Sequence, residues 1–357
     1  MAADDFADRV VRWQAEHGRH DLPWQGTRDP YRVWLSEIML QQTQVATVLD
    51  YYPRFLARFP DVRALAAAAL DEVLALWSGL GYYSRARHLH RCAQVVVQAH
   101  GGVFPASAAA LQALPGIGRS TAAAIAAFCF DERVAILDGN VRRVLARVLG
   151  FDADLAQAAH ERALWERAAQ LLPEADLADT MPRYTQGLMD LGATVCLAKN
   201  PRCDLCPLAQ VCVARREGDP GRYPVRTRRL KRRTEDWWLL LYLDDAGRCW
   251  LAPRPPRGIW AGLYCPPVHG QPVEPTGPGV QVRPLAVFTH VLTHRDLRLH
   301  PVVVRGAAPP PDASGAWHGR DAWRQLGLPA PIRRLLEALP DAGHSDCDSC
   351  SRPPDKG

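Results

Sequence analysis

Long apolar runs are missing from this chain of 357 residues. The longest, such as "WWLLLYL" at 237–243, are much shorter than the roughly 20 residues of a membrane-spanning helix. No apolar stretch follows the acidic opening "MAADDFADRV", so no export signal is recognised. We therefore predict a cytoplasmic protein with no membrane partner.

An excess of one charge is also missing, because 38 Asp and Glu residues nearly balance 43 Lys and Arg residues. The formal net charge of +5 suits a polyanionic partner but does not identify one. Ten cysteines without an export signal indicate thiols or metal ligands rather than disulfides. The chain length and the 48% of hydrophobic residues predict about two domains.

The character of the sequence changes once along the chain. Residues 1–215 have helical periodicity, as in "HERALWERAAQLL", and are predicted to be almost entirely helical. Residues 216–235 hold Pro, Gly and a basic cluster, which predicts an exposed linker. Short β-rich runs at 236–340 predict a small sheet with a helix or two. Residues 341–357 are predicted to be disordered.

A glycine turn opens the helix-like stretch "LPGIGRSTAAAI" at 114–125. It lacks the third glycine of a dinucleotide-binding turn, and Arg119 stands where a P-loop has lysine. What remains is a helix-hairpin-helix, in which the turn at Gly116 and Gly118 binds a DNA backbone phosphate through its N–H groups. The alternative is a plain corner between two helices with a glycine cap.

Four cysteines close the helical half in a Cys-x6-Cys-x2-Cys-x5-Cys array: Cys196, Cys203, Cys206 and Cys212. Thiolates packed so closely indicate a metal centre, either zinc or a 4Fe–4S cluster. Zinc usually joins two Cys-x-x-Cys pairs and the array has one, so we predict the 4Fe–4S cluster. Lys199 and Arg202 in its first loop are candidates for phosphate contacts, or are merely solvated. Cys347 and Cys350 near the C-terminus are assigned no function.

Several stretches of residues 1–215 carry a family resemblance: "LPW" at 22–24, "VWLSEIMLQQTQV" at 33–45, "GLGYYSRAR" at 79–87 and "LDGNVRRVLAR" at 137–147. Together with the hairpin and the cysteine array, this half resembles the endonuclease III superfamily of DNA glycosylases, and closely its adenine DNA glycosylase branch, the MutY type. The resemblance implies a multidomain α + α/β fold. In it an all-helical helix-hairpin-helix domain with a 4Fe–4S cluster loop precedes a Nudix-like α/β domain.

The same resemblance implies a function and a partner. The partner is double-stranded DNA in which adenine is mispaired with 8-oxoguanine or guanine, and the protein is a monomer that joins the nucleoid when bound. Its reaction is hydrolysis of the adenine N-glycosidic bond, with no efficient cutting of the strand. Protein partners are not indicated by the sequence.

Glu37 and Asp138 fit the chemistry of base removal, which needs an acid for the leaving base and an anion beside the sugar oxocarbenium ion. Val33 and Leu40 flank Glu37 on its predicted helix, and apolar neighbours raise a carboxyl pKa. Asp138 precedes a helix beginning near Val141, whose N–H groups favour the charged form. The alternatives are a solvated helix face for Glu37 and a simple N-cap for Asp138.

Other site residues follow from the resemblance alone. It implies that Glu37 protonates adenine at N7, that Asn140 supports Asp138, and that Gln42 and Tyr82 enter the DNA stack when adenine is extruded. Four residues are implied to line the adenine pocket or contact the base: Trp24, Leu40, Val45 and Gln186. Taken alone, such residues also suit an ordinary core or helix start.

The stretch "GRCWLAPRPPRGIWAGLYCPP" at 247–267 resembles the Nudix-related domain with which this family recognises 8-oxoguanine. A Nudix hydrolase carries a Glu-rich, Mg²⁺-binding helix, and the chain has none after this stretch. The family's Phe-Ser-His recognition loop is matched to Phe288, Thr289 and His290, in which Thr keeps the hydroxyl donor.

Ser120 follows the glycine turn, where lyase-competent relatives carry a lysine that forms a Schiff base with the sugar. A serine hydroxyl without an adjacent base is a poor nucleophile, so the abasic product is predicted to stay uncut. Two other functions remain open, namely a strand-nicking glycosylase for damaged pyrimidines and a non-catalytic DNA-binding module.

Overall fold

The computed structural model describes the residues 3–225, 227, 232–310 and 314–339. The chain forms two compact units, the first made of residues 1–68 and 84–229, the second of residues 69–83 and 230–357. The short segment 69–83 thus belongs, by its contacts, with the C-terminal part of the chain. In the described ranges, no helix has the length and apolar character needed to cross a bilayer.

Two predictions fall partly on residues outside these ranges. The tail predicted at 341–357, including Cys347 and Cys350, lies outside the described residues. So do residues 226 and 228–231 of the predicted linker.

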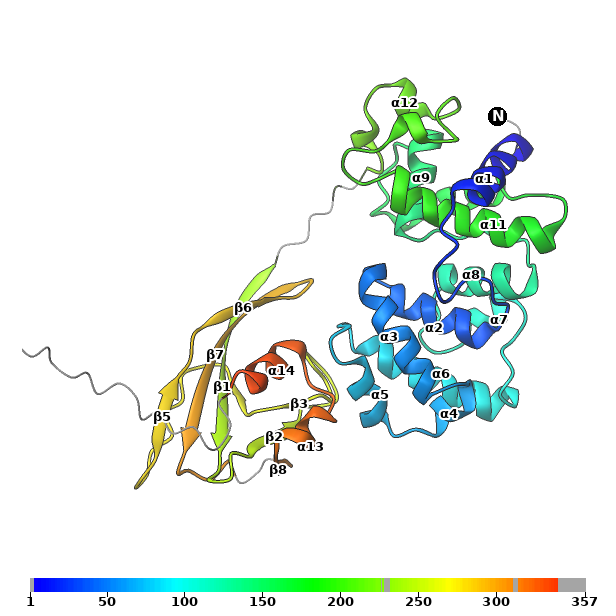
Figure 1. Cartoon of the computed structure of the whole chain (residues 1–357). Helices are drawn as coiled ribbons and strands as arrows, with labels where there is room; N and C mark the ends of the chain where they lie inside the picture. The colour runs from blue at the N-terminus through cyan, green and yellow to red at the C-terminus, as the bar shows by residue number, and fades with distance from the viewer. Residues whose placement is uncertain (1–2, 226, 228–231, 311–313, 340–357) are drawn as a thin grey trace, which may run out of the picture. The chain divides into compact units, whose positions relative to one another are not determined.

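The first unit is helical, as the periodicity predicts (Figure 1). Its α-helices are α1 (Ala3–His17), α2 (Pro30–Leu40), α3 (Val45–Arg58), α4 (Val62–Ala67), α6 (Ser84–His100), α7 (Ala108–Gln112), α8 (Arg119–Phe130), α9 (Gly139–Leu149), α10 (Ala158–Ala169), α11 (Leu177–Asp190) and α12 (Val213–Arg216). Helix α8 packs against α2, α7 and α11. This close packing is possible because its inner stretch Ala122–Ala127 is almost all alanine and fully buried.

The predicted helix-hairpin-helix is formed by α7, the glycine turn and α8. Gly116 has φ of 76°, and a Cβ there would lie 2.5 Å from Cβ of His88, so only glycine fits without strain. Gly118 is the N-cap of α8 with φ of −83°, and a Cβ there would meet no atom within 4 Å. The two glycines therefore differ, since the fold requires one and the other borders open space.

The cysteine array follows α11 without a break. A π-helical turn η1 (Leu191–Val195) leads into Cys196, and the short 3₁₀ turns η2 (Cys203–Leu205) and η3 (Pro220–Arg222) flank α12. The same elements thus join the array to α9 and α11, which form the core of this unit.

The second unit contains an eight-stranded mixed sheet in the order β3-β2-β1-β7-β5, with β4 beside β1, β6 beside β7 and β8 beside β2. The strands are β1 (Arg233–Leu243), β2 (Cys249–Pro253), β3 (Tyr264–Cys265), β4 (Val268–His269), β5 (Gln281–Pro284), β6 (Phe288–Val291), β7 (Arg295–Arg305) and β8 (Ala316–His318). Strands β1 and β7 run parallel along their full length, and Figure 1 shows them side by side. The unit also holds α5 (Leu70–Trp77), α13 (Arg320–Arg324) and α14 (Ala330–Glu337).

Candidate active site

A cavity of about 900 Å³ opens in the first unit. Its walls come from the segment 19–28, from α2 and from α11, and from the first residues of α8 and α9. Nine of the predicted site residues line it, namely Trp24, Glu37, Leu40, Gln42, Val45, Ser120, Asp138, Asn140 and Gln186. The fold thus brings together residues from five separate stretches of sequence, in a space large enough for a nucleobase and its sugar.

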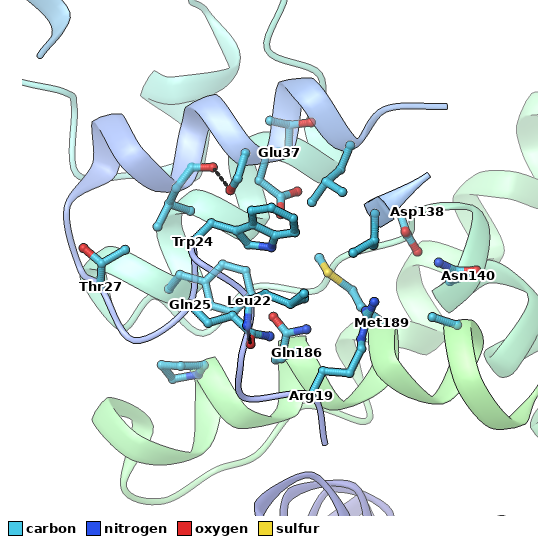
Figure 2. A pocket seen from close by; sticks show the side chains of 18 of the residues that line it. Arg19, Leu22, Trp24, Gln25, Thr27, Glu37, Asp138, Asn140, Gln186 and Met189 are labelled. Carbon is cyan, nitrogen blue, oxygen red and sulfur yellow. Dashed lines mark hydrogen bonds between the residues drawn. The ribbon is translucent and has the colours of Figure 1, made fainter. Parts of the chain in front are cut away.

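Glu37 reaches the cavity from α2 (Figure 2). This helix is fixed at its start by Pro30 and by Asp29, whose carboxylate accepts from the N–H of Tyr31 at 2.9 Å. Burial, and to a smaller extent the nearby Asp138 carboxylate, raise the pKa of Glu37 from an ordinary 4.5 to about 8. The predicted direction is confirmed, and near neutral pH this side chain holds a proton.

Asp138 is the N-cap of α9 and accepts from the N–H of Val141 at 2.7 Å. Burial raises its pKa, and this outweighs the opposing effects of the Val141 and Asn140 N–H groups and of the guanidinium groups of Arg143 and Arg142. The N–H groups at the start of α9 favour the charged form, as predicted, but the net shift of the pKa is upward. The reason is that the cavity wall removes more water than the helix N-terminus replaces.

The charge of Asp138 is the second cause of the raised pKa of Glu37, after burial. Asp138 also keeps four stabilising partners for the charged form. Ser120 supports the segment that precedes Asp138, because its Oγ accepts from the N–H of Leu137 at 3.2 Å.

Asn140 is held by an arginine that the sequence does not reveal as a site residue. Arg143 donates to Oδ1 of Asn140 at 2.9 Å, to the carbonyl of Gly192 at 2.7 Å and to the carbonyl of Cys196 at 2.8 Å. One guanidinium therefore joins Asn140 in the cavity wall to the first cysteine of the array.

Gln186 has a fixed amide orientation. Its Nε2 donates to Oδ1 of Asp190 at 2.8 Å, and a carboxylate can only accept, so the amide nitrogen must face Asp190. Asp190 is fully buried and is itself held by Arg19 through Nε at 2.7 Å and the backbone N–H at 2.9 Å. The carbonyl oxygen of Gln186 is thus the atom left to face the cavity.

Trp24 and Gln42 occupy different parts of the cavity wall. Trp24 is buried and packs edge-on against Tyr52, with ring centroids 5.5 Å apart. Gln42 is exposed and has φ of 56°, a strained conformation for a residue other than glycine. Arg85 fixes the turn beneath it by donating to the carbonyls of α2 at its C-terminal end and to Oγ1 of Thr43.

The four cysteines of the array fit a cluster. None forms a disulfide, and burial together with the other three thiols raises the pKa of Cys206 to about 11. The thiols thus face one another, which suits a centre whose irons replace the thiol protons. Within the described part of the chain, no three His, Cys, Asp or Glu side chains are arranged to hold a single ion; a 4Fe–4S cluster instead binds each thiolate to a separate iron.

Arg147 is a second arginine beside the array and is only 3% exposed. It donates to Sγ of Cys196 at 3.3 Å and to the carbonyl of Leu197 at 2.6 Å. It also donates to the carbonyls of Pro220 at 2.9 Å and Tyr223 at 3.2 Å, within the predicted linker at 216–235. Its partners lie 49 to 76 residues away in the sequence, so no local pattern could have identified it.

Some predicted site residues lie outside the cavity. Gly116 and Gly118 are at the hairpin, and Lys199 and Arg202 are exposed on the cysteine loop. None of these lines the cavity, as expected of residues predicted to contact the DNA backbone rather than the base.

The prediction that Phe288–His290 forms a loop is wrong. These residues form strand β6, which pairs antiparallel with β7 from Phe288 opposite Leu299 to Val291 opposite Asp296. Alternation along the strand leaves Phe288 and His290 half-buried and Thr289 exposed. The turn between β6 and β7 lies at 292–294, and its sequence is Leu-Thr-His.

Tyr82 and this turn lie together in the second unit. The hydroxyl of Tyr82 is 3.0 Å from Oγ1 of Thr293. Tyr82 is 45% exposed and has φ of 48°. The two residues that were predicted to enter DNA, Gln42 and Tyr82, therefore share an exposed position and a left-handed backbone, and such strain is commonly found at functional sites.

Three regions of the chain match family models. Residues 35–170 match the HhH-GPD superfamily of base excision DNA repair proteins. Residues 196–212 match the iron–sulfur binding domain of endonuclease III, and residues 237–338 match the NUDIX domain. These matches confirm the predicted fold class and the cluster, which we assign to the four cysteines as 4Fe–4S.

Whole-chain comparisons agree with these matches. An adenine DNA glycosylase of Buchnera aphidicola subsp. Acyrthosiphon pisum is 32% identical over 343 residues, covering 93% of this chain and 97% of the relative. An adenine DNA glycosylase of Rattus norvegicus is 45% identical over 226 residues, covering 61% of this chain and 43% of the relative. A solved thermostable thymine-DNA glycosylase is 28% identical, with a TM-score of 0.53 over 60% of this chain and 97% of its own.

Proposed function

Because the chain belongs to the adenine DNA glycosylase family of base excision repair, we propose that it removes adenine opposite 8-oxoguanine or guanine and leaves the strand uncut. The observation that carries this proposal is the pair of carboxyls in one cavity, of which Glu37 keeps its proton to about pH 8 and Asp138 supplies the charge. An acid and an anion of this kind are what cleavage of a purine N-glycosidic bond needs.

In the proposed reaction, Glu37 donates its proton to the extruded adenine at N7 and makes the base a better leaving group. As the bond breaks, the sugar becomes an oxocarbenium ion, which the Asp138 carboxylate stabilises until water adds to C1′ and passes a proton to the carboxylate left on Glu37. Asn140, held by Arg143, supports the Asp138 side of the site. When bound, a 4Fe–4S cluster on four thiolates supplies an anionic centre, against which the Arg147 guanidinium is placed.

Recognition of adenine is proposed to depend on Gln186. Its fixed amide presents a carbonyl oxygen, which accepts from the exocyclic amine of adenine and repels the O6 oxygen of guanine or hypoxanthine. Trp24, Leu40 and Val45 supply apolar wall for the flat base.

Ser120 supports the proposal that the enzyme does not cut the strand. Its hydroxyl accepts from the N–H of Leu137 and so serves the backbone before Asp138. A serine so engaged does not form the Schiff base that a lysine forms with the sugar.

The base opposite adenine is proposed to be read in the second unit by the turn at 292–294. Thr293 carries the hydroxyl donor of the family's Phe-Ser-His loop and lies beside Tyr82, the residue proposed to enter the stack. We place this role at Thr293 instead of Thr289, because Thr289 is held within β6. Contacts of Gly116, Gly118, Lys199 and Arg202 with phosphates complete the proposed interface with DNA.

Single-turnover excision on duplexes with adenine opposite 8-oxoguanine, opposite guanine and opposite thymine tests the proposal. Glu37→Gln and Asp138→Asn should each abolish base release and leave mismatch binding largely intact, because they remove proton donation or charge and not the DNA-contacting surface. The exposed Glu166→Gln is the matched control and should release adenine at the wild-type rate. Retained excision by either cavity variant, or strand cleavage without alkali, would contradict the assignment.

A further inference from the structure

The segment 69–83 precedes α6 in the sequence but makes its contacts with the C-terminal part of the chain. Val73, Leu74 and Trp77 on α5 are fully buried. Contact is so close that a Cβ on Gly327 would lie 2.8 Å from Cβ of Leu74 and 3.3 Å from Cδ2 of Leu263. A turn just before α14 thus packs directly against α5.

The carbonyl of Leu328 in this turn is the centre of a small polar cluster. It accepts from Oγ of Ser78 at 2.7 Å and from the hydroxyl of Tyr83 at 3.0 Å. Arg333 on α14 donates through Nε to the same Ser78 Oγ at 3.1 Å. Leu328 is fully buried and Tyr83 is 8% exposed, so these hydrogen bonds are shielded from water.

Ser78 and Tyr83, which both donate to Leu328, are the two ends of the loop that carries Tyr82. Within this loop the hydroxyl of Tyr83 also accepts from the N–H of Gly79 at 3.3 Å, which closes the loop on itself. Gly79, Gly81 and Tyr82 all have positive φ, of 109°, 73° and 48°. A left-handed tyrosine persists only where its surroundings hold it, and here those surroundings include residues from the C-terminal part.

We propose that the Gly327–Leu328 turn holds the Tyr82 loop in the conformation that enters DNA, with Ser78, Tyr83 and Arg333 as positioning residues. The C-terminal part would then do more than read the base opposite adenine. It would support engagement of every duplex, including adenine opposite guanine, by fixing the residue that fills the stack. This inference rests on the proposed role of Tyr82.

Amide hydrogen exchange of the free protein tests, without DNA, whether the Gly327–Leu328 turn holds the Tyr82 loop. Gly327→Ala, which forces Leu74 away, and Tyr83→Phe, which removes one hydrogen bond to Leu328, should each speed exchange across residues 78–83. The matched control is Gly319→Ala in the same unit, because its Cβ would come no closer than 3.9 Å to Cγ of Arg248. Unchanged exchange in both test variants would overturn the proposal.

Binding to duplexes then tests the consequence. Tyr83→Phe should weaken binding to adenine opposite guanine and opposite 8-oxoguanine alike, by about five- to tenfold, because it removes the shielded hydrogen bond to Leu328 and the weaker one from Gly79. In a Tyr82→Ala background the same substitution should add nothing, because the residue being positioned is absent. An added loss in that background, or a loss on the 8-oxoguanine duplex alone, would overturn the proposal. Wild-type binding by Tyr82→Ala itself would instead refute the proposed role of Tyr82, whatever exchange shows.

Discussion

Replacing Glu37 with glutamine should make the protein more stable above mildly acidic pH, although it removes the catalytic proton. The pKa of Glu37 rises from 4.5 to about 8 on folding. Between these values the folded protein binds a proton that the unfolded chain has lost, so the free energy of unfolding falls as pH rises. Each pH unit in this window removes about 1.4 kcal/mol. At pH 7 the buried carboxyl therefore destabilises the fold by about 3 kcal/mol, and above pH 8 by about 5 kcal/mol.

Urea unfolding of the two proteins at a series of pH values measures this effect. The difference in unfolding free energy should be near constant below pH 4.5, grow by about 1.4 kcal/mol per unit, and level off near pH 8. Any fixed effect of a buried amide shifts the whole difference and leaves its slope unchanged. Glu166→Gln, at an exposed position of α10, is the control. A difference that stays flat from pH 5 to pH 8 would refute the argument that the cavity holds Glu37 protonated.

Four other outcomes are expected. Asp190→Asn frees the Gln186 amide to turn. The preference for adenine over purine lacking the 6-amino group should therefore fall about tenfold in single-turnover excision. An equal loss of excision rate on both bases would show a merely structural effect. Ser120→Lys should give a borohydride-trapped adduct with abasic DNA, because position 120 lines the same cavity as the two carboxyls; wild-type levels of adduct would show that it does not face C1′. Gly118 is an N-cap with open space around it, so Gly118→Thr should keep the melting temperature of the protein yet weaken its binding to all duplexes alike. A loss of binding to one mismatch alone would contradict this. Gly116→Thr should lose about 1–3 kcal/mol of stability even without DNA.

The cavity could largely be predicted from sequence, because its residues stand in long, distinctive stretches. Glu37 on a helix with apolar neighbours and Asp138 before a helix both lie where the patterns put them. The net direction of the Asp138 pKa could not be predicted. It depends on how much water the remaining cavity walls remove, and those walls come from distant parts of the chain.

Arginines were the residues that sequence reasoning missed. Arg85, Arg143 and Arg147 each donate to backbone carbonyls of segments 46 or more residues away. A carbonyl acceptor has no sequence signature, so only the fold shows which of the chain's arginines are structural. The prediction of a loop at Phe288–His290 failed for a related reason. Phe-Thr-His and Leu-Thr-His stand four residues apart, and strand pairing decides which one is the turn.

The wide separation of Tyr83 from Leu328 has a consequence for synthesis of the chain. Their hydrogen bond joins residues 245 positions apart, and at about 5–20 residues per second the second arrives on the order of 10–50 s after the first. During that interval the first unit acquires all of its own residues, up to 229, while α5 still lacks the turn that packs against it. The nascent chain thus presents the apolar side chain of Leu74 to the folding machinery of the cell, and a product terminated before Gly327 lacks the residue that packs against it.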